Sequence, residues 1–152
     1  MNAKANSRCA TFVLNLIMVI ELLIGHSVEA AATLCSQEDA IKAETKASTL
    51  RSWHAVFNSY QNYNQCDDGA VSEGYSNSIA LLLANDWSRI AELTNIFAAH
   101  PKFRHFVLHH VDELMSQDQA KLIQNNATSH CPKTSSRFCA ALVKRLAEIP
   151  GS

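Results

Sequence analysis

The sequence predicts an all-α fold, a compact single-domain bundle of about six helices stapled by two disulfides. Apolar residues recur at intervals of three or four over most of residues 36–149, which is the period of an amphipathic helix. Residues that begin or end helices stand between these stretches, and no run of alternating β-branched residues indicates a strand. With 47% hydrophobic residues, four glycines and three prolines, the 152-residue chain has the composition of one folded domain.

The first predicted helix covers residues 36–63, where no glycine or proline interrupts the chain. Ser36 is placed to cap it, with Asp39 three residues further on. The stretch fits one long straight helix, and a break near Ser48 and Thr49 is the alternative. Its second half carries an apolar stripe at helical spacing: Leu50, Trp53, Phe57 and Tyr60.

Turn residues at 64–69 separate this helix from the next one, which either Asp67 or Asp68 can cap. Gly74 lies inside the second helix, where glycine costs roughly 1 kcal/mol against alanine, so we expect it at a close crossing of two helices. Asp86 can cap a third helix. The apolar stripe of that helix is Trp87, Ile90, Leu93 and Phe97.

Pro101 suits the first position of a fourth helix, predicted over residues 101–115 with Leu114 on its buried side. Ser116 and Gln119 match a capping box, in which the first and fourth residues satisfy each other's backbone donors. A fifth helix is therefore expected directly after this fourth one.

Residues 125–132 are predicted to form a loop, which includes an acceptor pattern for N-glycosylation at Asn126. Ser135 or Ser136 is then expected to cap a last helix, whose inward side ends at Ile149. The sequence does not indicate whether Asn126 is modified.

Residues 1–30 have the pattern of a secretory signal peptide, which leaves residues 31–152 as the helical domain. Lys4 and Arg8 precede an apolar run, and small or short residues at 28–30 suit cleavage after Ala30. The alternative is a membrane anchor, but the run is short for a span of about 20 residues and contains Glu21. The sequence therefore predicts a periplasmic or secreted protein without stable membrane insertion after cleavage.

Four cysteines remain after removal of the signal peptide, and an even number in an exported chain predicts two disulfides. They are Cys35, Cys66, Cys131 and Cys139. If residues 36–63 form one straight helix, its ends lie about 40 Å apart, and Cys35 cannot reach Cys66. This favours the crossed patterns, in which each of these two bonds to Cys131 or Cys139. If the chain folds back near Ser48, Cys35–Cys66 and Cys131–Cys139 become the candidates.

Composition and motifs exclude several classes of function. The formal net charge is −1 without a basic stripe, which argues against a nucleic-acid partner. No nucleophile elbow, no glycine-rich phosphate loop and no closely spaced cysteine pair for zinc occurs. We therefore expect no cofactor, no metal and no enzymatic activity.

His105 and His109 are four residues apart and share one face of the fourth helix. Two imidazoles at this spacing can hold zinc. A zinc peptidase of this type also needs a glutamate after the first histidine as general base, and that position is Phe106. We interpret the pair as part of an exposed polar face, with adventitious metal binding or a binding role as alternatives.

Asp67, Asp68 and Glu73 form an acidic turn beside Cys66. Helix capping and favourable interaction with the helix dipole account for carboxylates at this place. The remaining hypothesis is a charged surface for a basic protein partner, with His105 or His109 close by.

The sequence thus predicts an exported helical module that binds another protein, similar in general architecture to exported inhibitors and immunity-type proteins. The oligomeric state is left open. One alternative is a carrier of a small apolar ligand, with a cavity among Trp53, Tyr75, Trp87 and Phe106. The other is a small metal-dependent hydrolase in which Glu73 converges with His105 or His109 in a cleft.

Overall fold

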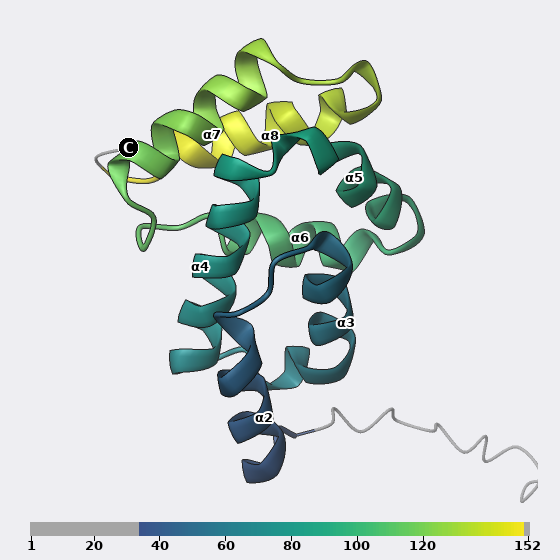
Figure 1. Ribbon diagram of the computed structural model, residues 1–152, viewed down its shortest axis with the longest axis vertical. Helices are drawn as coiled ribbons and strands as arrows, with labels where there is room; N and C mark the ends of the chain where they lie inside the picture. Colours follow the sequence, from purple (N-terminus) through teal and green to yellow (C-terminus); the bar gives the residue numbers. More distant parts are fainter. Residues whose placement is uncertain (1–33, 151–152) are drawn as a thin grey trace, which may run out of the picture. The chain divides into compact units, whose positions relative to one another are not determined.

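The computed structural model describes residues 34–150, and these residues form seven α-helices and three short 3-10 helices without a strand (Figure 1). The predicted all-α fold is confirmed for this part of the chain, whereas the predicted signal peptide lies outside the described residues. No described helix is long and apolar enough to cross a membrane. The α-helices are α2 (Gln37–Ala47), α3 (Trp53–Tyr63), α4 (Gly69–Asn85), α5 (Ile90–Ala99), α6 (Pro101–His109), α7 (Gln117–Ser129) and α8 (Ser136–Ala147). The 3-10 helices are η2 (Asn64–Cys66), η3 (Trp87–Arg89) and η4 (Lys133–Ser135).

The long straight helix is wrong, because the chain breaks after Ala47 and α3 packs back beside α2 (Figure 1). The side chain of Thr49 donates to the carbonyl of Lys46, which satisfies the end of α2. Ser52 then has extended backbone, and its hydroxyl accepts from the amide of Ala55 to cap α3. Polar side chains that bond to nearby backbone thus compete with helix continuation here.

This fold-back decides the disulfide pairing. Cys35 is bonded to Cys66 with their Cα atoms 4.9 Å apart, and Cys131 is bonded to Cys139. The crossed patterns that the straight helix favoured are therefore wrong, and the pairing expected for a fold-back near Ser48 is present.

Helix α4 contacts α2, α3 and α7, and its first turn is capped by Asp68. The expected close crossing occurs at Gly74. A Cβ atom at this position would lie 2.7 Å from Cβ of Ala47 and 2.9 Å from the backbone nitrogen of Ser48. Only the absence of a side chain allows α2 and α4 to approach this closely.

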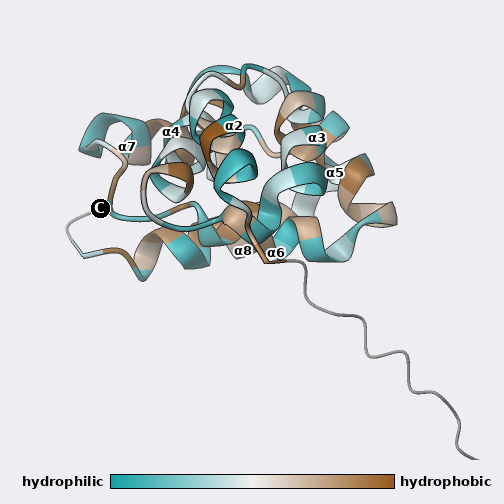
Figure 2. Ribbon diagram, turned by 90° about the horizontal axis from the view of Figure 1, so that it is seen from below, coloured by the Kyte–Doolittle hydropathy of each residue, from teal (hydrophilic) through white to brown (hydrophobic). Residues whose placement is uncertain are grey.

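The amphipathic pattern of the helices places an aromatic cluster in the core. Figure 2 shows hydrophobic and hydrophilic bands alternating along the helices. Trp53, Tyr75 and Phe103 are completely buried. Rings of Tyr60 and Phe103 lie 5.1 Å apart, and the ring of Tyr75 lies 5.0 Å from that of Phe106. This cluster joins α3, α4 and α6.

The helix predicted over residues 101–115 ends at His109, and Leu114 is 59% exposed instead of buried. The carboxylate of Asp112 accepts from the amide of Leu114, so the chain turns locally instead of continuing the helix. The predicted capping box of Ser116 and Gln119 is confirmed at the start of α7.

The loop predicted from residue 125 begins later, because α7 continues to Ser129. Asn126 therefore lies in a helix, and its side-chain amide donates to the carbonyls of Leu83 and Ala84 at the end of α4. Ser135 precedes α8, but its side chain makes no capping hydrogen bond.

Candidate functional site

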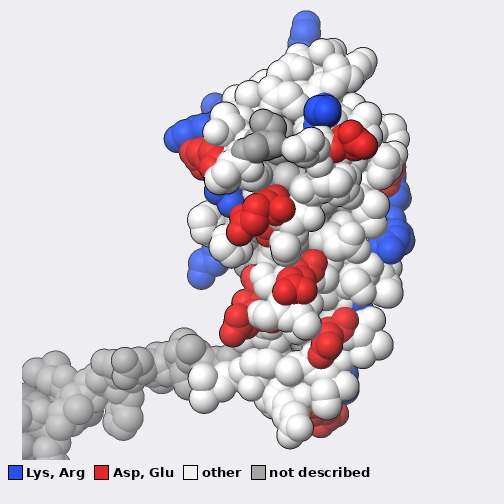
Figure 3. Space-filling model, turned by 90° about the vertical axis from the view of Figure 1, so that its left-hand side faces the viewer, with Lys and Arg blue, Asp and Glu red and all other residues white. Residues whose placement is uncertain are grey.

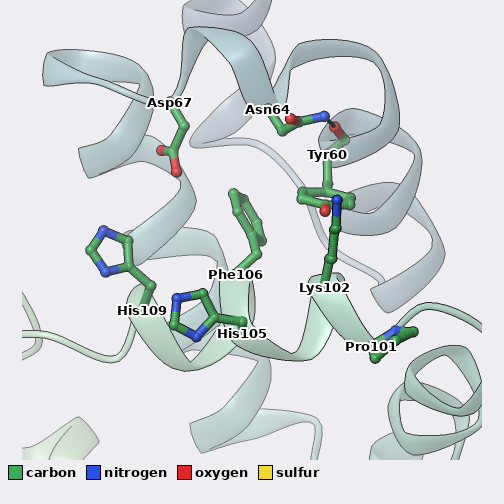
Figure 4. A pocket seen from close by; sticks show the side chains of 8 residues that line it. All are labelled: Tyr60, Asn64, Asp67, Pro101, Lys102, His105, Phe106 and His109. Carbon is green, nitrogen blue, oxygen red and sulfur yellow. Dashed lines mark hydrogen bonds between the residues drawn. The ribbon is translucent and has the colours of Figure 1, made fainter. Parts of the chain in front are cut away.

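A shallow groove of about 640 Å³ lies between the C-terminal end of α3 and the exposed face of α6 (Figure 4). The residues around it come from α3, from the segment that leads into α4, and from α6. They are Tyr60, Asn64, Asp67, Pro101, Lys102, His105, Phe106 and His109. We call this feature the α3–α6 groove.

The floor of the α3–α6 groove is aromatic. The rings of Tyr60 and Phe106 lie 4.8 Å apart, and both rest on Phe103 of the core. Phe106 itself is 7% exposed, whereas Tyr60 is half-buried. An apolar side chain laid on these rings would lose water contact without disturbing the core.

The rim is polar and is built by the helical period of α6. Lys102, His105 and His109 lie three or four residues apart and project along one edge, while Asn64 and Asp67 form the opposite edge (Figure 4). Lys102, His105 and His109 are exposed. Ammonium and imidazole donors therefore stand beside the aromatic floor.

A buried chain of hydrogen bonds holds the Asp67 edge in place. Nε2 of His110 lies 3.1 Å from Oδ2 of Asp67, and Nδ1 of His110 lies 3.0 Å from the hydroxyl of Ser76. The same hydroxyl donates to Oδ2 of Asp112 over 2.5 Å. Four side chains thus tie the start of α4 to the end of α6.

Proton counting fixes the charge of this buried chain. Three hydrogen bonds among two carboxyl groups, one hydroxyl and one imidazole need three protons. With both carboxylates ionised the imidazole must be protonated, and with a neutral imidazole one carboxyl must be protonated. Either arrangement leaves a net charge of −1 over Asp67, His110, Ser76 and Asp112.

The chain contains the residue types of a serine hydrolase, but its geometry differs from one. Ser76 is 1% exposed and His110 is completely buried, so a substrate carbonyl cannot approach the hydroxyl. The hydroxyl proton is directed at Asp112 instead of at the imidazole. In a hydrolase the imidazole accepts that proton as general base. The arrangement instead fixes the positions of these four side chains, as buried hydrogen-bond networks do.

One carboxylate oxygen of Asp67 belongs to this series of hydrogen bonds, and the other has no partner among the described residues. Its Oδ1 is buried and makes no hydrogen bond within the described residues. The side chain as a whole is 16% exposed and lies at the edge of the α3–α6 groove. Because Cys66 is bonded to Cys35, the backbone next to this carboxylate is anchored covalently.

The structure brings three of the five predicted site residues together. Asp67, His105 and His109 line the α3–α6 groove. Asp68 caps α4 by accepting from the amide of Gly69 at 2.8 Å, and Glu73 is exposed on α4 outside the groove lining. The predicted role of all five in binding stays a prediction.

Carboxylates gather along one side of the described domain, with Lys and Arg mainly toward its edges (Figure 3). A basic partner would meet a favourable potential on this side. Asp67 contributes little to such a surface, because it is paired with His110. The exposed carboxylates of the acidic turn are Asp68 and Glu73.

The structure does not gather the four residues of the expected ligand cavity at the α3–α6 groove. Trp53 and Tyr75 are completely buried, and Trp87 donates its indole N–H to the carbonyl of His130. Of the four residues of the expected ligand cavity, only Phe106 lines the α3–α6 groove. Within residues 34–150 no group of three or more histidine, cysteine or acidic residues could hold a metal ion.

Sequence reasoning missed His110 and Ser76 as partners. The signal for His110 was its register: it lies seven residues after Phe103 and four after Phe106, on the buried stripe of α6. A histidine at a core position requires polar partners, and these come from a distant helix.

Tyr75, one residue before Ser76, packs against the same imidazole at 5.6 Å between ring centres. Burial raises the pKa of the Tyr75 phenol, and a hydrogen bond to Ser59 opposes this effect.

Comparison of the chain with protein-family models, with curated proteins and with solved structures finds no match.

Proposed function

We propose that this chain is an exported, non-enzymatic domain that binds another protein in the periplasm or outside the cell. The α3–α6 groove carries this proposal, because the half-buried ring of Tyr60 lies over the buried ring of Phe106 and forms an aromatic floor on a rigid support. Two disulfides are consistent with an oxidising compartment. The disulfide of Cys66 and the buried bonds of His110 limit movement of one groove edge. Such preorganisation reduces the entropy lost on binding.

The partner segment that fits best carries an apolar or aromatic side chain next to a carboxylate. The apolar group would cover the rings of Tyr60 and Phe106, whose centres lie 4.8 Å apart. The carboxylate would meet Lys102, which has no ion pair within residues 34–150, and the imidazoles of His105 and His109. Charge complementarity of this kind sets the specificity and the association rate of a complex.

Selection from a displayed random-peptide library tests this proposal. We expect enrichment of peptides that place Phe, Tyr or Leu next to Asp or Glu. The strongest peptide would then be synthesised and titrated calorimetrically into the wild type and into the double variant Lys102→Gln with His109→Gln. Loss of the Lys102 ammonium and the His109 imidazole should weaken binding at least about tenfold, because a hydrogen bond to a charged group such as the ammonium contributes roughly 1.5–3 kcal/mol.

The double variant Asp68→Asn with Glu73→Gln is the matched control, because it also changes two polar surface residues but lies outside the groove lining. Its affinity for the acidic peptide should equal or slightly exceed that of the wild type. Enrichment of basic peptides whose binding requires Asp68 and Glu73 would replace the groove by the acidic turn as the binding site. No enrichment at all would contradict the proposal.

A further inference from the structure

A smaller pocket of about 220 Å³ lies among α5, the first turn of α6, η4 and the start of α8. Its lining includes two arginines, Arg104 and Arg137, and the hydroxyl-bearing residues Thr94, Thr134 and Ser135. Phe97 and Phe138 form its apolar side. A water molecule occupies about 30 Å³ of liquid, so the pocket has room for a small ion and several waters.

The two guanidinium groups have unused donors. Arg104 donates through Nη2 to the carbonyl oxygen of Arg137 at 3.3 Å, whereas its Nε is buried without a partner in the described part of the chain. The guanidinium of Arg137 is exposed and forms no hydrogen bond or ion pair within residues 34–150. No aspartate or glutamate is among the described residues that line this pocket. The positive charge at the pocket is therefore uncompensated there.

Of the three hydroxyl groups of the residues that line this pocket, that of Thr134 is free to donate within the described residues. The hydroxyl of Thr94 donates to the carbonyl of Ala91, so its 3.1 Å contact with Ser135 uses the proton of Ser135. The hydroxyl of Thr134 has no hydrogen bond among the described residues and lines the pocket. Ser135 does not cap α8 with its side chain, so the positive end of that helix dipole also faces this region.

We propose that this pocket binds a small tetrahedral oxyanion, namely a phosphate or sulfate group. Arginine presents a planar fork of N–H donors that matches such oxygens, and two guanidiniums without a counter-ion gain from an anion between them. Thr134 supplies a neutral donor, and the phenylalanine side leaves space for an apolar group attached to the anion. The proposal is independent of the α3–α6 groove, because none of these five polar residues lines the groove.

Nuclear magnetic resonance titration of the oxidised protein tests the proposal. The probes are inorganic phosphate, inorganic sulfate and phenyl phosphate, each compared with sodium chloride at equal ionic strength. We expect saturable shifts of the amides of Thr134, Ser135 and Arg137. Tighter binding of phenyl phosphate identifies an organic ester as the source of the anion, and equal binding identifies the free ion.

Arg137→Gln removes one guanidinium from an exposed position, and Lys144→Gln removes the same charge from an exposed position further along α8. Arg137→Gln should weaken binding at least about tenfold, because charge-assisted hydrogen bonds are lost, whereas Lys144→Gln should leave it within about twofold. Equal weakening by both variants would show that the anion responds to general charge. That result, or the absence of saturable shifts with all three probes, overturns the proposal.

Discussion

Replacing His110 by leucine tests whether the buried imidazole holds the start of α4 against the end of α6. Leucine fills most of the space beside Phe106 but donates no hydrogen bond. Within residues 34–150 it leaves both oxygens of Asp67 without a partner, because Oδ1 has none already and Oδ2 bonds to His110. The hydroxyl of Ser76 also loses one of its two partners.

The expected loss of stability in His110→Leu follows from the burial of His110 and Asp67. Leaving a buried polar group without its hydrogen-bond partner costs roughly 1–3 kcal/mol in the free energy of unfolding, and more for a charged group. His110 is completely buried and Asp67 is only 16% exposed, so we expect a cost of about 3 kcal/mol. Domains of this size have a total stability of about 5–15 kcal/mol, so the variant should stay folded at room temperature.

A second substitution, Asp67→Asn, is expected to change the stability in opposite directions in the His110→Leu variant and in the wild type. In the His110→Leu background it replaces an unpaired buried charge by a neutral amide and should restore about 1–2 kcal/mol. In the wild-type background the same change removes a charged partner of His110 and should destabilise. Urea unfolding followed by circular dichroism measures all four proteins, with unchanged m-values as the check on two-state behaviour.

The exposed neighbour provides the control, because His109→Leu should change stability by no more than about 0.5 kcal/mol. If Asp67→Asn destabilises the His110→Leu variant further, the two residues do not act as a coupled pair. The reasoning about the buried chain would then be refuted.

Two further predictions concern the disulfides and the buried phenol of Tyr75. Replacing Cys35 and Cys66 by serine should lower the free energy of unfolding by about 4 kcal/mol, because this disulfide closes a separation of 31 residues. Removal of the C-terminal disulfide, with its separation of 8, should cost only about 2.5 kcal/mol. Thermal denaturation measures both variants, and the reverse ranking would contradict the loop-closure argument. The pKa of Tyr75 is raised by burial, so the stability that this phenol contributes is fully present below its unfolded value of about 10 and is lost as the pH rises through the higher folded value. Tyr75→Phe should therefore flatten the alkaline loss of stability while costing about 1 kcal/mol at neutral pH, because Ser59 loses its partner; parallel alkaline unfolding of both proteins would contradict this assignment.

Local signals predicted the ends of several helices because the responsible bonds are local. The caps at Ser36 and Asp68 and the capping box at Ser116 each join residues within four positions of one another. The close crossing at Gly74 was also predictable, because a glycine inside a helix needs a compensating contact. The number of helices exceeds the expected six because the first predicted helix is divided into α2 and α3.

The break between α2 and α3 was underdetermined by helix propensity. Neither glycine nor proline marks it, and the competing bonds come from Thr49 and Ser52, which also occur inside helices. The disulfide pairing depended on this one decision, because only a folded-back chain brings Cys35 beside Cys66.

The candidate site was predicted only in part, because some of its contacts are local in sequence and others are not. Helical spacing placed His105 and His109 on one face, and the structure keeps them at one groove. The partnership of His110 with Ser76 joins residues 34 positions apart, and no pattern in a single sequence specifies such a pairing. The aromatic floor under the histidines required the packing of α3 against α6.

The amide nitrogen of Asn126 lies 3.2 Å from two carbonyl oxygens of α4, and a sugar transferase would need this same nitrogen. A glycan would remove one of its protons and place a bulky group between α4 and α7. Modification and docking of α7 therefore exclude each other in the arrangement described. In a cell with such a transferase, glycosylated Asn126 would indicate that the enzyme acted before α7 packed against α4, and unmodified Asn126 would indicate that α7 packed first.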